Sequence, residues 1–474
     1  MTAVLAVDQG TSGTKAVVVD PVDGVLAAAE VAVHPVHLAG GGVEVDPQEL
    51  WESVLAAGHQ ALELAGRPVG AVALANQGET VLAWDPETGR PLTPALVWQD
   101  HRSAALCNDL AEHHEWVAER TGLVLDPYFT APKMAWLRRN LTTEGVVTTS
   151  DTWLLHRLTG EFVTDVSTAS RSLLVDLDTA TWDPELVSLF GVAGEPLPRI
   201  AACDEVVGET SAFGAPLAVG GLLVDQQAAL LGQGCLQAGE AKCTFGTGAF
   251  LLANTGGRPT RSSAGLTASV AWRLRGVTSW CLDGQVFTAG SAVTWLQELG
   301  LIERAADLDG VAADGAGTVV CVPALAGLGA PWWRPDATAT FSGLTLSTRP
   351  GHLVAAVLQG IAAQVAELVD LVGTDLGTPL TTLRVDGGLT ASEFLLQATA
   401  DLTGVPVEVS PHPHATAVGA AVAARLATTP SSTPEDAVPP WNPSARFDPR
   451  WSDDRRASFR HAWHRAAAGT GDPS

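Results

Sequence analysis

The chain has 474 residues, of which 46% are hydrophobic and 17% charged, and its formal net charge is −25. A chain of this length exceeds the roughly 250–300 residues at which a single hydrophobic core stops growing, so two lobes are expected. The acidic charge argues against nucleic acid or an anionic membrane as a partner, and any phosphate has to be bound locally, by backbone dipoles and a metal ion.

The cysteine pattern and the absence of export signals indicate the compartment. The six cysteines are scattered, without a CxxC pair or a zinc-type histidine spacing. This usage is typical of a reduced cytoplasmic protein with buried thiols. The sequence has no uninterrupted apolar span of about 18 residues, and its N-terminus lacks a basic region followed by an apolar one. We therefore expect a soluble, cytoplasmic protein.

The first predicted element is a β-hairpin. Two apolar runs, 4–7 and 16–19, flank a loop rich in glycine, serine and threonine. Such a loop leaves backbone N–H groups uncovered, and together with its hydroxyls it suits phosphate oxygens. Asp8, at the strand end, is placed to hold a metal ion or its water against that phosphate. An ordinary glycine-rich hairpin remains the alternative for this stretch taken alone.

A helix is predicted next, from Pro47 to about residue 64. Asp46 can cap it, proline fits its first position, and Glu49 completes a pattern like a capping box. Leu50 belongs to its inner face. Further strands are expected at 70–75 and 81–85, and another apolar segment follows at 95–98.

Asp225 follows the predicted strand 220–224 directly and begins a helix. Open α/β sheets place their ligands at the carboxyl ends of strands, so this carboxylate is a candidate functional group. The segment 243–253 then repeats the strand, glycine-threonine-glycine, strand order of the first hairpin. We therefore divide the chain into lobes 1–234 and 235–474.

The rest of the second lobe shows strand and helix patterns in turn. A strand is expected at 319–323, and a helix at 352–372 whose apolar residues, spaced by three and four, indicate core packing. The strand 382–385 ends in Gly387 and Gly388 before a helix. This turn either is merely tight or lets a ligand approach a helix N-terminus. A loop at 428–443 precedes a last helix at 457–468.

Six segments in one order resemble the FGGY carbohydrate kinase family, and within it the glycerol kinases. These segments are 8–15, 76–80, 98–102, 225–227, 246–250 and 386–392, and the likeness extends from about residue 4 to 424. The resemblance implies an α/β fold of two ribonuclease-H-like lobes of the actin and hexokinase type, with ATP and Mg²⁺ in a cleft between them and a polyol or sugar mainly against the first lobe.

The resemblance also implies residue roles. Asp225 matches the catalytic base, and Asp8 and Asp225 match the residues near Mg²⁺. The positions matching nucleotide contacts are Thr11, Ser12, Gly13, Lys15, Gly246, Thr247, Gly290, Gly388 and Ser392. The positions matching acceptor contacts are Gln77, Glu79, Trp98, Tyr128, Asp225, Gln226 and Phe250.

Several positions depart from the family pattern. Lys15 stands where the pattern has arginine and so lacks a bidentate fork. Thr294 and Ser392 replace a glutamine and an asparagine, and Gly78 replaces an arginine that binds glycerol hydroxyls. Losing one charged hydrogen bond costs roughly 1.5–3 kcal/mol. We expect this loss to weaken glycerol as the acceptor without excluding it. The missing side chain is also expected to open space beside Glu79, which favours a longer acceptor, a four- or five-carbon polyol or ketulose, as the best substrate.

Two other function classes remain open from the sequence. One is an actin-like ATPase that would need no polyol pocket, and the other is a sugar sensor without phosphotransfer. The presence of both Asp8 and Asp225 favours an ATP-dependent kinase. Its partner would be a small polyol or sugar, and a homodimer is left open.

Overall fold

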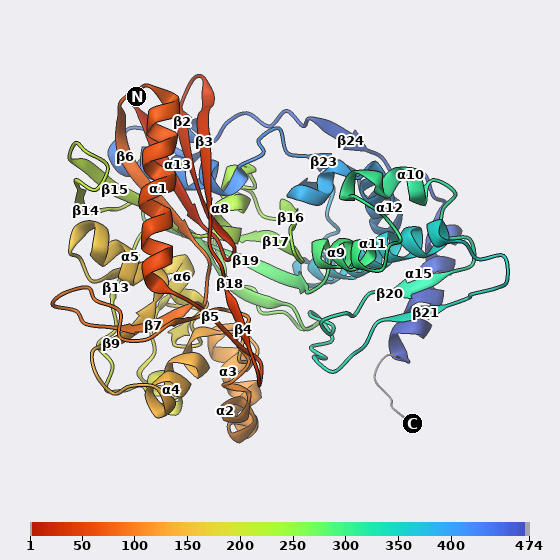
Figure 1. Ribbon diagram of the computed structural model, residues 1–474, viewed down its shortest axis with the longest axis horizontal. Coiled ribbons are helices and arrows are strands. Elements are labelled where there is room, and N and C mark those ends of the chain that lie inside the picture. Colours follow the sequence, from red (N-terminus) through yellow and green to blue (C-terminus); the bar gives the residue numbers. More distant parts are fainter. Residues whose placement is uncertain (1, 470–474) are drawn as a thin grey trace.

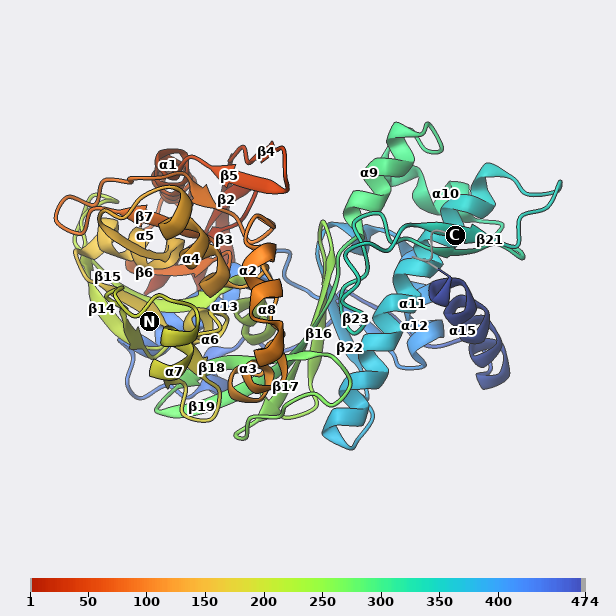
Figure 2. The ribbon, with the colours of Figure 1, turned by 90° about the horizontal axis from the view of Figure 1, so that it is seen from below.

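The computed structural model describes residues 2–469 and has two large mixed sheets (Figures 1 and 2). The first sheet has the order β14 (Val206–Thr210), β15 (Leu217–Val224), β6 (Val69–Asn76), β1 (Ala3–Gln9), β2 (Gly13–Asp20) and β3 (Gly24–Ala32). The second has the order β18 (Thr267–Leu274), β19 (Val277–Val286), β17 (Ala249–Gly256), β16 (Ala241–Phe245), β22 (Leu383–Asp386), β23 (Val407–Val409) and β24 (Ala445–Phe447).

The described residues also form smaller sheets. A five-stranded sheet has the order β4 (Val36–Leu38), β5 (Gly42–Val45), β8 (Ala95–Leu96), β7 (Val81–Trp84) and β9 (Val146–Thr149). The two-stranded pairs are β10 (Val163–Asp165) with β13 (Arg199–Ala201), β11 (Val175–Asp176) with β12 (Thr181–Trp182), and β20 (Val320–Val322) with β21 (Thr340–Ser342).

Helices flank both sheets. Those before residue 233 are α1 (Pro47–Ala65), α2 (Ala104–Asp109), α3 (His114–Thr121), α4 (Thr130–Asn140), α5 (Ser150–Thr159), α6 (Val166–Ser170), α7 (Pro184–Leu189) and α8 (Asp225–Gly232). The later ones are α9 (Gly290–Glu298), α10 (Leu308–Ala312), α11 (Pro350–Leu376), α12 (Glu393–Thr403), α13 (Ala415–Thr428), α14 (Pro434–Ala437) and α15 (Asp453–Ala468).

The first sheet is covered on both faces because its strands are apolar on both. Leu5 and Val7 pack in the core that contains α1, whereas Val4 and Ala6 pack in the core that contains α13. This alternation follows from the two-residue period of a strand. A strand buried on both faces reads as a continuous apolar run.

The predicted elements are present with small shifts in their ends. Asp46 caps α1 by accepting a hydrogen bond from Gln48 N at 2.9 Å. Glu49 does not complete a capping box, because its carboxylate contacts His34 Nδ1 at 2.6 Å. The predicted loop 428–443 contains the short α14. All six cysteines are buried free thiols, as the sequence predicted.

Two parts of the later chain pack against the earlier half. α13 lies on β15, β6 and β1, and α8 lies beside α13. β18 contacts α6, where Val270 N donates to Ser170 Oγ at 3.1 Å. The lobe boundary at residue 235 remains a prediction along the chain, and these contacts join the two halves in space.

The longest helix belongs to the core of the second half. By length and composition alone α11 could cross a membrane, but most of its length is buried inside the protein. Val357, Ile361 and Val365 on its predicted apolar stripe are fully buried. Figure 2 shows α11 running beside α12 and α15. We interpret it as a core helix.

Candidate active site

The first glycine-rich hairpin is held in a tight turn. Gly10 N donates to Gly13 O at 3.0 Å, and β1 pairs with β2 so that Asp8 lies opposite Lys15. The Thr11 hydroxyl accepts a hydrogen bond from Trp98 Nε1 at 2.8 Å. Lys15 lies 3.6 Å from the carboxylate of Glu30. The loop is therefore tied to Trp98, a predicted acceptor contact, through one hydroxyl.

Asp8 and Asp225 face each other at one edge of the first sheet. β1 and β15 both run parallel to β6, so their carboxyl ends meet at the same edge. Burial raises the pKa of Asp8 to about 7, and the charge of Asp225 is the next cause. Burial also raises the pKa of Asp225, against the opposing charge of Lys242. The sequence placed these carboxylates together, and the structure brings them into electrostatic contact.

This pair of carboxylates fits a magnesium ion. Mg²⁺ prefers oxygen ligands, keeps several waters and is bound by one or two carboxylates together with substrate phosphates. No cluster of three or more histidine, cysteine or acidic side chains suited to a metal occurs within residues 2–469. Two facing carboxylates beside an open glycine loop match the need of Mg²⁺ better than that of a metal held wholly by protein.

The predicted acceptor residues gather beside Asp225. The rings of Trp98 and Tyr128 lie 5.5 Å apart, and those of Trp98 and Phe250 lie 6.3 Å apart, in edge-to-face arrangements. Glu79 is buried, and its backbone has a positive φ of 58°. Burial raises the pKa of Glu79, while its ion pair with Arg171 acts against that rise.

Gln77 and Gln226 complete the predicted acceptor set. Gln77 is buried; its Nε2 lies 3.4 Å from Gln9 Oε1, and its own Oε1 has no partner in the described part of the chain. Gln226 Oε1 accepts a hydrogen bond from the buried ammonium of Lys242, which also donates to Thr244 Oγ1 at 2.9 Å.

The space beside Gly78 is not empty, contrary to our expectation. A Cβ placed on Gly78 would lie 3.0 Å from Val224 Cγ2 and 3.9 Å from both Cδ and Nε of Arg171. The side chains of Val224 and Arg171 therefore border the region that the sequence suggested was open. The sequence could not reveal this, because the two positions are far apart along the chain.

Lys133 is a second residue that the sequence analysis missed. It is fully buried, and its Nζ donates to the carbonyls of Pro127 at 2.9 Å and Phe129 at 2.8 Å, and also to that of Tyr128. Burial lowers the pKa of Lys133 to about 8. The ammonium therefore fixes the backbone on which Tyr128 stands.

The second hairpin forms one wall of an open pocket of about 490 Å³. Four predicted nucleotide contacts line it, namely Gly246, Thr247, Gly290 and Gly388. A Cβ on Gly290 would lie only 2.6 Å from Gly246 O, so glycine is required for this approach. The remaining lining includes Thr294 and Glu298.

Ser392 is engaged within the protein. Its hydroxyl donates to Asp309 Oδ1 and caps α12 by accepting from Leu395 N at 3.2 Å. It does not line the 490 Å³ pocket. With these two bonds in place, the Ser392 hydroxyl has no further hydrogen to donate and can only accept one more hydrogen bond. Ser12 and Gly13 lie in the first hairpin, where Ser12 O accepts from Val33 N at 3.0 Å.

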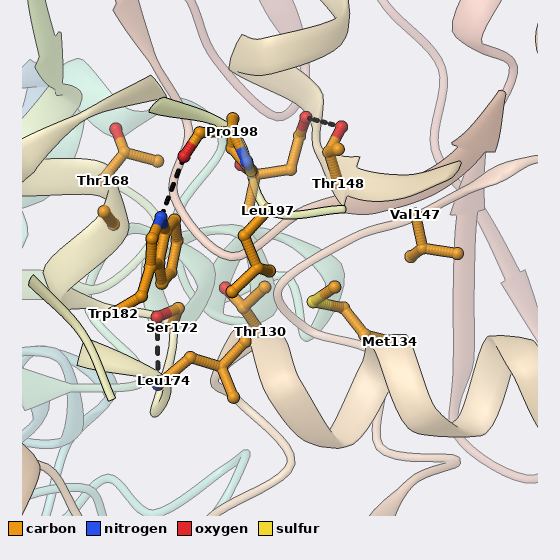
Figure 3. A pocket seen from close by; sticks show the side chains of 12 residues that line it. Thr130, Met134, Val147, Thr148, Thr168, Ser172, Leu174, Trp182, Leu197 and Pro198 are labelled. Carbon is orange, nitrogen blue, oxygen red and sulfur yellow. Dashed lines mark hydrogen bonds between the residues drawn. The ribbon is translucent and has the colours of Figure 1, made fainter. Parts of the chain in front are cut away.

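A separate small cavity lies inside the first half (Figure 3). Its volume of about 20 Å³ has room for about one water molecule. Met134, Leu174 and Leu197 give it apolar walls, and Trp182 Nε1 at its edge donates to Pro198 O at 2.8 Å. None of the predicted site residues lines it, so we interpret it as a packing gap.

Comparisons with known proteins agree with this arrangement. The N-terminal domain of the FGGY family of carbohydrate kinases matches residues 3–232, and the C-terminal domain of that family matches residues 241–428. The glycerol kinase of Thermus brockianus is 44% identical, and that of Alkalilimnicola ehrlichii is 42% identical, each covering 98% of both chains.

A solved structure extends the likeness to the fold. The crystal structure of Plasmodium falciparum glycerol kinase with ADP has a TM-score of 0.91 at 30% identity, covering 100% of this chain and 99% of that one. The predicted two-lobed α/β fold is thereby confirmed, and an acceptor-free ATPase or a sugar sensor is not favoured. Kinases of this family use ATP with Mg²⁺. The chain belongs to the FGGY family of carbohydrate kinases and is an ATP-dependent phosphotransferase.

Proposed function

We propose that the protein transfers the γ-phosphoryl group of ATP to a terminal hydroxyl of glycerol or a closely similar small polyol. The observation that carries this proposal is the placement of Asp225, which faces Asp8 on one side and, on the other, interacts electrostatically with Glu79 and Tyr128. The glycerol kinase relatives support glycerol as the first acceptor to test.

Each group has a defined task in this proposal. Asp225 accepts the proton of the attacking hydroxyl, which is the role that phosphoryl transfer to an alcohol requires of a carboxylate. Glu79 accepts hydrogen bonds from acceptor hydroxyls, and Trp98 and Phe250 cover the carbon chain. Asp8 and Asp225 would hold Mg²⁺, which would neutralise the negative charge that develops on the phosphate oxygens while ATP supplies the phosphoryl group.

The two hairpins would hold the nucleotide from opposite sides. Thr11, Ser12, Gly13 and Lys15 would meet the β- and γ-phosphates, and the 490 Å³ pocket with Gly246, Thr247, Gly290 and Gly388 would take the rest of the nucleotide. Backbone N–H groups can do this in an acidic protein because they need no basic field. We place the enzyme in the cytoplasm, and a homodimer stays open.

An acceptor panel with one variant tests the proposal. In a coupled assay of ADP release, glycerol is expected to be a better acceptor than erythritol, threitol, erythrulose, xylulose and ribulose. Asp225→Asn should lower kcat by about 10²–10⁴-fold with little change in the acceptor KM, because a positioned general base contributes that much. ADP release that does not depend on any added alcohol, or an unchanged kcat in Asp225→Asn, would contradict the assignment.

A further inference from the structure

A row of polar side chains on β19 faces the predicted acceptor site. Phe250 on β17 lies directly opposite Gln285 on β19 in the antiparallel register. Opposed residues of such a pair point to the same face of the sheet, and so does Asp283, two residues before Gln285. Because Phe250 meets Trp98 on this face, Asp283 and Gln285 lie on the side of the sheet that bounds the acceptor.

Gln285 has an unused hydrogen-bond acceptor. The residue is 2% exposed, and its Nε2 donates to Asp283 Oδ1. Its Oε1 has no partner among residues 2–469. Asp283 itself is fully engaged, since Oδ1 also accepts from Thr267 Oγ1 at 2.6 Å and Oδ2 accepts from Arg171. This free oxygen lies on the face that bounds the predicted acceptor site, so it is available to a ligand there.

Arg171 supplies the matching donor. Its Nε donates to Glu79 and its Nη1 to Asp283, so two buried carboxylates hold the guanidinium in one orientation. Nη2 makes no hydrogen bond to any residue of the described chain, although a guanidinium carries five N–H donors. The guanidinium carbon Cζ of Arg171 lies 5.7 Å from the centroid of the Tyr128 ring and 5.6 Å from the centroid of the Phe129 ring.

We propose that Arg171 and Gln285 form the subsite for the acceptor hydroxyl farthest from the one that Asp225 deprotonates. The guanidinium donates to the oxygen of that hydroxyl, and Gln285 Oε1 accepts its hydrogen. The pair thus recognises a neutral group that is both donor and acceptor. It takes the place of the cation that Gly78 cannot supply, because Arg171 lies beside that glycine. The inference rests on the proposed kinase function.

The test compares acceptors that differ in this one hydroxyl. Glycerol has it, whereas propane-1,2-diol keeps the other two hydroxyls and has a methyl group instead. In Gln285→Met, kcat/KM for glycerol should fall about two- to tenfold, the effect of one neutral hydrogen bond, and should change less than twofold for the diol. Arg171→Lys keeps the positive charge but loses the second N–H group of the guanidinium. The ratio of kcat/KM for glycerol to kcat/KM for the diol should therefore fall by about tenfold or more in this variant.

Gln364→Met is the matched control, since Gln364 is also 2% exposed and has a partnerless Nε2, but lies on α11. In this control the ratio of kcat/KM for glycerol to kcat/KM for the diol should equal that of the wild type. Equal losses for both acceptors in Gln285→Met, or no loss for either, would overturn the subsite. Should Gln285→Met fail to fold by circular dichroism, Arg171→Lys decides by the same ratio. Failure of the proposed function would look different, since the wild type would then phosphorylate neither acceptor.

Discussion

The two glycine-rich hairpins have matching backbones but different side chains. In the first sheet β1 pairs antiparallel with β2 and parallel with β6, and in the second β16 pairs antiparallel with β17 and parallel with β22. Two residues before the loop glycine, the first hairpin has Asp8 and the second has Thr244. Asp8 faces Asp225, whereas the Thr244 hydroxyl donates to Asp386 at 2.6 Å.

This difference separates the two tasks of a kinase. Both hairpins offer backbone N–H groups, but only in the first does a carboxylate stand two residues before the loop glycine, where it would hold the proposed metal ion. In the second hairpin Lys242 contributes a buried ammonium that donates to both Thr244 and Gln226, and so links the two halves. We infer that the repeated backbone serves the nucleotide in both halves and that the side chains assign the metal and the acceptor to the first.

The largest expected effect comes from replacing Asp8, in comparison with Thr244 at the matching position of the second hairpin. Asp8→Asn should lower kcat by about a hundredfold or more, because a metal ion contributes several kcal/mol of charge stabilisation in the transition state. Thr244→Val should lower it less than about tenfold. Rates measured against Mg²⁺ concentration check this, since only Asp8→Asn should raise the Mg²⁺ needed for half activity. Equal effects at the two positions would remove the proposed division of tasks.

A smaller effect is expected from crowding the second hairpin. Gly290→Ala would place a Cβ 2.6 Å from Gly246 O, and overpacking of this kind costs about 1–3 kcal/mol. Gly388→Ala is the matched control, because Gly388 lines the same pocket and its Cβ would meet nothing within 4 Å. Thermal unfolding should show lower stability for Gly290→Ala only, and ADP titration should show weaker binding for Gly290→Ala. An unaffected Gly290→Ala would mean that the two loops need not touch.

The smallest expected effect is a dependence of the acceptor KM on pH. Burial lowers the pKa of Lys133 to about 8, so its ammonium loses a proton as pH rises through 8. A neutral amine has two N–H groups and can no longer donate to all three carbonyls around Tyr128. We expect the acceptor KM to rise about two- to tenfold between pH 7 and 9, the cost of one hydrogen bond, while the KM for ATP stays constant.

The control for this prediction is Lys133→Met, whose acceptor KM should be high at both pH values. Between pH 8 and 10.5 the folded state binds fewer protons at Lys133 than the unfolded state, so this group makes the free energy of unfolding rise with pH. The expected loss of affinity for the acceptor therefore cannot be explained by unfolding of the protein when Lys133 loses its proton. A step near pH 8 that persists in Lys133→Met would assign it to another group.

Local patterns in the sequence predicted the hairpins and the place of Asp225 at the end of a strand, whereas the role of Asp225 came from the resemblance to the family. Runs of β-branched residues around a glycine loop predict a hairpin wherever they stand, and a strand that leads directly into a helix puts its last polar residue at the sheet edge. The same local reasoning failed at Gly78, where a missing side chain suggested open space. Arg171 borders that space from a segment 92 residues away from Glu79.

The sequence by itself determined the strands, the two glycine-rich loops and the positions of the carboxylates Asp8 and Asp225 beside them, because each follows from residues that are neighbours in the chain. Only the tertiary structure decided which buried groups surround the acceptor. Arg171 meets Asp283 across 112 residues, and Gln285 lies opposite Phe250 because β19 pairs with β17 in one register. Burial and strand register are properties of the packed molecule, so the roles of these side chains cannot be read from their neighbours in sequence.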